Sequence, residues 1–135
     1  MSLITWNDAL SVGIKQIDDQ HRRLVRLVNG LFDAMKEGKG KDLMGGVLSD
    51  LITYTAYHFS TEEHYFKQYG YPDSVKHIQE HLYLTKSATD LKTKFDKGEA
   101  IITVEVMQFL KDWLNNHILR TDKKYSPFLI GKGLK

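Results

Sequence analysis

Four segments of the chain carry apolar residues at steps of three and four, which is the spacing of one face of an α-helix. They cover about residues 19–37, 43–69, 74–97 and 103–119. Glycine follows each of the first three segments, at Gly38, Gly70 and Gly98, as expected at helix ends. The 135 residues include only two prolines, so little interrupts the periodic stretches. The pattern predicts an all-α protein.

The segments are similar in length, roughly 25 to 40 Å at 1.5 Å per residue, and short connections join them. Short connections place consecutive helices antiparallel to one another. We therefore expect one domain, residues 1–135, folded as an antiparallel up-down-up-down four-helix bundle. Residues 1–18 should form an N-terminal arm across the bundle, and the tail after Tyr125 should be an irregular extension.

Ionisable side chains fall on the apolar stripes. An ionisable group in a core is costly unless it is paired or bound to a metal. Any one of these residues alone is better explained as a hydrogen-bonded core residue. All four helices contribute, however, and inward-facing groups of four helices meet at one axis, so together they predict a metal centre. The stripe residues are five of the six histidines and one glutamate: His21, His58, Glu62, His77, His81 and His117.

Two pairs of these residues are four positions apart and so share a helix face. His77 and His81 give the stronger signal, because two histidines gain little from each other without a cation. His58 and Glu62, taken alone, would also suit a surface hydrogen bond.

Asp122 is a less obvious candidate ligand. It follows His117 by five positions, which separates the two side chains by roughly 140° on an ideal helix. They converge only if the helix ends or loosens between them; otherwise Asp122 is a surface acid. His64 lies about 200° around the helix from Glu62 and is expected to face away from the site.

Five imidazoles and two carboxylates exceed the four ligands of a tetrahedral zinc. They suit two six-coordinate ions. With both carboxylates bridging and one bridging oxygen from solvent, such a pair keeps a single open position. The chain has no cysteine, and imidazole with carboxylate suits iron, although manganese and mixed metals stay open.

Charge and hydropathy exclude other classes of function. The net charge is +2, and the basic residues are interleaved with acids, which gives no focused field for nucleic acid. No apolar run approaches the roughly 20 residues that cross a bilayer, so we expect no membrane insertion. The N-terminus lacks the basic start and apolar run of a secretory signal, so a cytoplasmic location is expected.

These residues resemble the hemerythrin family, most closely its single-domain bacterial members, over almost the whole chain. The ligand set in this fixed order is highly specific. The chain departs from the family at Tyr65 and Phe66, where an aliphatic residue and then methionine are common. The resemblance rests on Trp6 and Gly13 in the arm, Ile17-Asp18-Asp19-Gln20-His21, His58-Phe59 with Glu62-Glu63, Gly70-Tyr71-Pro72, His77, His81, Trp113-Leu114, His117-Ile118 and Asp122.

The resemblance implies two iron ions, Fe2+ or Fe3+, joined by an oxo or hydroxo bridge. One iron would take three histidines, the other would take His21 and His58 and keep the open position for dioxygen, and Glu62 and Asp122 would bridge the pair. The three histidines of the filled iron would be His77, His81 and His117. Four apolar neighbours of the ligands would either wall the gas pocket or simply pack the core: Phe59, Trp113, Leu114 and Ile118.

The function implied is reversible binding of dioxygen for storage or transport, with delivery to oxygen-using enzymes. No catalytic residue is expected, because di-iron enzymes of other bundles are usually richer in carboxylates. Two alternatives stay open. One is sensing of oxygen, nitric oxide or redox state through a separate partner, and the other is a di-iron oxidase, peroxidase or nitric oxide reductase.

Overall fold

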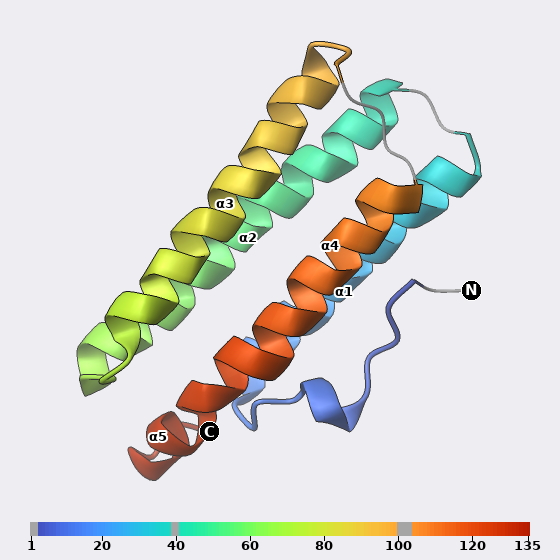
Figure 1. The fold of residues 1–135 in the computed structure, drawn as a ribbon. Helices are drawn as coiled ribbons and strands as arrows, with labels where there is room; N and C mark the ends of the chain where they lie inside the picture. The colour runs from blue at the N-terminus through green and yellow to red at the C-terminus, as the bar shows by residue number, and fades with distance from the viewer. Residues whose placement is uncertain (1–2, 39–40, 100–103) are drawn as a thin grey trace.

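The computed structural model describes residues 3–38, 41–99 and 104–135. Within these ranges the chain forms helices and no strand. Consecutive long helices run antiparallel and form an up-down-up-down four-helix bundle (Figure 1). The predicted all-α bundle with an N-terminal arm is confirmed. The four long helices are α1 (Lys15–Lys36), α2 (Lys41–Tyr69), α3 (Ser74–Asp96) and α4 (Val104–Asn116).

The helix ends differ from the sequence expectation at several places. α1 begins at Lys15, four residues before the expected start at 19, because Ile14 and Ile17 are fully buried and hold this turn against the bundle. The expected start of the fourth helix, at 103, lies outside the described residues. α2 runs through Gly45, whose missing side chain makes room for the ring of Phe95: a Cβ there would lie 3.3 Å from it.

The expected irregular extension after Tyr125 is wrong. α4 continues through a π-helical segment, η2 (His117–Asp122), into α5 (Lys123–Gly131), which contains Pro127. Proline removes one helical hydrogen bond, but Tyr125 and Leu129 are completely buried, and the Ser126 hydroxyl donates to the Val12 carbonyl with its oxygen 2.5 Å away. This packing holds the last helix in place.

The N-terminal arm lies along the bundle and includes a short 3-10 helix, η1 (Asp8–Leu10) (Figure 1). Ile4 and the Asn29 side chain of α1 exchange two hydrogen bonds of 2.9 Å. Near α1, the backbone N–H of Val12 donates to Asp18 at 2.8 Å. The described part of the arm is therefore held at Ile4 and again at Val12.

Two apolar clusters fill the bundle, and a polar layer separates them. On α1 the first cluster begins at Leu24 and the second ends at Ile17. On α2 the first includes Phe59 and the second Phe66. His21 lies between Ile17 and Leu24, and Glu62 lies between Phe59 and Phe66. No described helix is long and apolar enough to span a bilayer.

Candidate metal centre

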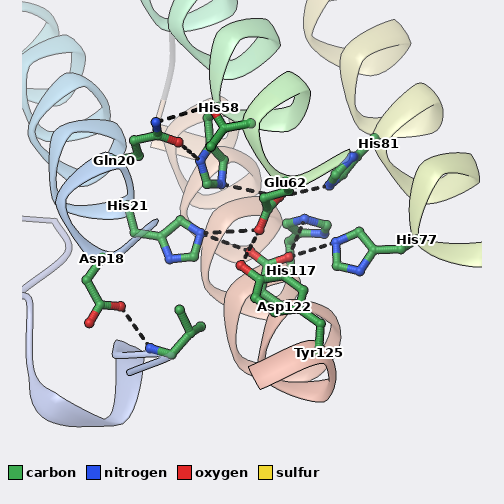
Figure 2. Close-up of polar contacts among 12 residues, drawn as sticks. Asp18, Gln20, His21, His58, Glu62, His77, His81, His117, Asp122 and Tyr125 are labelled. Atoms are coloured by element: carbon green, nitrogen blue, oxygen red, sulfur yellow. Dashed lines mark hydrogen bonds and ion pairs between the residues drawn. The ribbon is translucent and has the colours of Figure 1, made fainter. Parts of the chain in front are cut away.

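The seven candidate ligands converge in the polar layer (Figure 2). Each is at most 4% exposed. They come from three of the four long helices and from the π-helical segment that follows the fourth. α1 contributes His21, α2 contributes His58 and Glu62, α3 contributes His77 and His81, and η2 contributes His117 and Asp122.

The π-helical segment η2 explains how Asp122 reaches the site. A π-helix bonds residue i to residue i+5, so residues five apart fall nearly in line. Nε2 of His117 lies 2.9 Å from Oδ1 of Asp122. The helix therefore loosens between the two residues. The two side chains were expected from the sequence to converge only in that case.

The ligand atoms form two overlapping groups, and both groups include Glu62 and Asp122. The atoms of each group lie within 4.8 Å of one another. We name the groups by their histidines. The three-histidine group contains His77, His81 and His117 with the two carboxylates, and the two-histidine group contains His21 and His58 with the same carboxylates.

The two carboxylates lie between the groups. Oδ1 of Asp122 is 2.9 Å from Nε2 of His77, while Oδ2 is 3.0 Å from Nε2 of His21. Oε1 of Glu62 is 3.3 Å from Nε2 of His58 and 3.1 Å from Nε2 of His81. Each carboxylate therefore lies within 3.3 Å of a histidine of either group.

The inward-facing atoms fit cations. Eight buried side-chain atoms complete no hydrogen bond of good geometry among the described residues. They are Nε2 of all five histidines, Oε1 of Glu62 and both carboxylate oxygens of Asp122. Buried polar atoms without partners are costly, and a cation would satisfy several at once. Imidazole nitrogen and carboxylate oxygen are ligands of iron and related metals. The cluster is thus able to hold a metal.

Three polar side chains orient the histidines from behind. Nδ1 of His58 bonds Gln20, Nδ1 of His81 bonds Glu63 and Nδ1 of His117 bonds Glu80, at 2.7 to 2.8 Å. With Nδ1–H donating, the Nε2 lone pair points to the centre. Helical periodicity did not single out these three residues. Each directly adjoins a candidate ligand in sequence, a signal that could have found them.

The surroundings of His58 and His117 shift their pKa values in opposite directions. Burial lowers the pKa of His58 to about 4. Burial also lowers the pKa of His117, but the charges of Asp122 and Glu80 outweigh it and raise that pKa to about 10. Burial raises the pKa of Asp122, yet His117 and the neighbouring histidines hold it well below its usual range. Without metal, a proton therefore resides on His117 beside an ionised Asp122.

A small cavity adjoins the two-histidine group. Its volume is about 10 Å³, enough for about one molecule of the size of water. Its lining includes His21, His58 and His117. The four residues named above as pocket walls all line it: Phe59, Trp113, Leu114 and Ile118.

Two residues outside the predicted set are placed differently from the ligands. His64 is exposed and faces a surface groove between α2 and α3, as expected. Phe66, a departure from the family pattern, does not line the cavity; its ring packs 5.4 Å from that of Tyr125. The departure therefore changes the second apolar cluster and not the cavity wall.

Residues 12–129 match the sequence model of the hemerythrin HHE cation binding domain. The chain belongs to the hemerythrin family. Among other hemerythrins it is 38% identical over 130 residues to the bacteriohemerythrin of Methylococcus capsulatus, covering 96% of this chain and 98% of that one. It is 34% identical over 126 residues to the bacteriohemerythrin of Stenotrophomonas maltophilia, covering 93% and 81%. The crystal structure of a wild-type hemerythrin superimposes with a TM-score of 0.89 at 37% identity, covering 95% of this chain and 98% of that one.

Proposed function

We propose that this hemerythrin binds dioxygen reversibly at a di-iron centre and stores the gas or carries it to oxygen-using enzymes. One observation carries the proposal. A water-sized cavity, whose wall includes Phe59, Trp113, Leu114 and Ile118, lies against both histidines of the group that has fewer histidines. The smaller number of histidine ligands and the free space therefore coincide at one place.

Each iron would be held by its own set of histidines. One iron would be held by His77, His81 and His117, the other by His21 and His58. Glu62 and Asp122 would bridge them. When bound, the irons supply the electrons that dioxygen takes up on binding and returns on release.

The cavity wall would protect the bound gas. Phe59, Leu114 and Ile118 are at most 5% exposed and offer no ionisable group. A dry wall excludes the water and protons that would release the gas in reduced form. Trp113, 7% exposed, closes the wall between this cavity and a surface groove that it also lines.

Oxygen titration of the iron-loaded protein tests the proposal. Anaerobic loading with Fe2+ should give two irons per chain. Air should then produce a charge-transfer colour that fades on deoxygenation and returns over repeated cycles. Bleaching within one cycle, with consumption of a reductant, would instead indicate an enzyme. A partner protein that binds in only one oxygenation state would indicate a sensor.

A further inference from the structure

The three-histidine group has negative charge directly behind it. Nδ1 of His81 bonds Glu63 at 2.8 Å, and Nδ1 of His117 bonds Glu80 at 2.7 Å. The Thr121 hydroxyl lies 2.8 Å from both oxygens of Glu80 and fixes that carboxylate. Two of the three histidines in this group therefore have a carboxylate partner.

The two-histidine group has no such charge. Nδ1 of His58 bonds the amide oxygen of Gln20 at 2.7 Å. The orientation of the amide is set by its nitrogen, which donates to the Thr61 hydroxyl at 3.2 Å. Nδ1 of His21 is buried and has no hydrogen-bond partner among the described residues. Both histidines of this uncharged group line the cavity, whereas the three-histidine group contributes only His117 to its lining.

A carboxylate that accepts from Nδ1–H makes the imidazole a stronger donor to its metal and adds negative charge near it. Both effects favour the more highly charged cation. An amide acceptor orients the ring without adding charge. The side chains of Glu63 and Glu80 are 35% and 37% exposed, so solvent screens their charge in part, but the direct hydrogen bonds to the ligands remain.

We propose that Glu63 and Glu80 are positioning residues that make the two metal positions unequal, so that the three-histidine iron becomes ferric first. The iron beside the cavity then stays ferrous through the first one-electron oxidation. This inference rests on the proposed function in one respect, the presence of two irons. It does not require that gas binding be reversible. The electron that could reduce a bound gas molecule thus remains on the iron beside the cavity.

Anaerobic redox titration of the iron-loaded protein, without dioxygen, measures the two steps. Replacing a carboxylate with an amide, Glu80→Gln or Glu63→Gln, should weaken the ferric preference of the three-histidine iron about tenfold. That raises the potential of the first oxidation by about 59 mV. Gln20→Glu should act on the other iron and lower the potential of the second oxidation by a similar amount.

Glu105→Gln is the matched control, because it removes the same charge from an exposed position on α4 and should shift neither step. If Glu80→Gln loses iron, Gln20→Glu still decides the matter, since it adds charge. The proposal is overturned if the variants shift the potentials of both steps equally or shift neither potential. It is also overturned if the two irons are oxidised in one unresolved step. Two ordered steps without reversible gas binding would sink the proposed function and leave this inference standing.

Discussion

The phenol of Tyr125 donates a hydrogen bond to Oε2 of Glu62, linking the last helix to a carboxylate at the centre of the bundle (Figure 2). Both side chains are completely buried. Burial, and then the charge of Glu62, raise the pKa of Tyr125 well above its ordinary value. The hydroxyl therefore stays protonated and serves as a fixed donor.

Tyr125→Phe should lower the free energy of unfolding by about 1 to 3 kcal/mol, because it leaves a buried carboxylate oxygen without its donor. Urea denaturation of the metal-free protein measures the change. Tyr65→Phe is the control: its hydroxyl bonds Gln16 at the surface, and a loss below about 0.5 kcal/mol is expected. Equal losses for the two variants would contradict the role of Tyr125.

His77→Ala should lose iron and lower the thermal stability of the iron-loaded protein, because metal binding contributes to folding. Metal analysis and a melting curve measure both effects. His64→Ala, on the same bundle but exposed, should leave both unchanged. Full iron content in both variants would show that α3 supplies no ligand.

Metal binding at pH 7 should release a proton from His117, whose pKa in the metal-free protein is about 10. His58, with a pKa of about 4, is already neutral and should release none. Metal affinity should therefore rise with pH between 7 and 10. Calorimetric titration with Co2+ in buffers of different ionisation enthalpy counts the protons, and His117→Gln should remove one of them.

The same shift has a consequence for the stability of the metal-free fold. The folded-state pKa of His117 lies above its ordinary value of 6.5, so the protonated form favours the folded state. This contribution is complete below about pH 6.5 and is lost as the pH rises through 10. Unfolding curves of the metal-free protein at pH 6, 8 and 10 should show the decline, and the decline should be smaller in His117→Gln.

Leu114→Ala should shorten the lifetime of the oxygenated protein, because it enlarges the cavity and lets water approach the irons. Leu110→Ala removes an equally buried leucine of the same helix that does not line the cavity. Each change should cost about 2 to 5 kcal/mol of stability. Decay of the oxygenated spectrum should accelerate only in Leu114→Ala; equal acceleration would show that loss of stability is the cause.

Six of the seven candidate ligands could be found from helical periodicity, because His21, His58, Glu62 and the histidines of α3 and η2 replace apolar residues on inward-facing stripes. Asp122 could not, because α-helical spacing directs it away from His117. Only the family resemblance indicated it. The wider turn that brings it inward depends on tertiary packing, which local propensity does not encode.

Helical periodicity does not indicate the partners of the ligands either. Gln20, Glu63 and Glu80 lie about 100° around their helices from the adjacent ligands, which on a stripe analysis places them at the edge of the buried face. Their contacts depend on how neighbouring helices are rotated about their axes. The order of helices could be predicted from loop length, whereas these rotations could not. The helical tail was missed because the burial of Tyr125 outweighs the effect of Pro127.

The wide turn of η2 sets the rotational phase of everything that follows it in the chain. Deleting one residue between His117 and Asp122 would turn α5 by about 100° about its axis. Tyr125 would then leave Glu62, and Leu129 would leave the second apolar cluster. A length change in this segment would therefore disconnect the C-terminal helix and the metal site together, even though every ligand remained in the sequence.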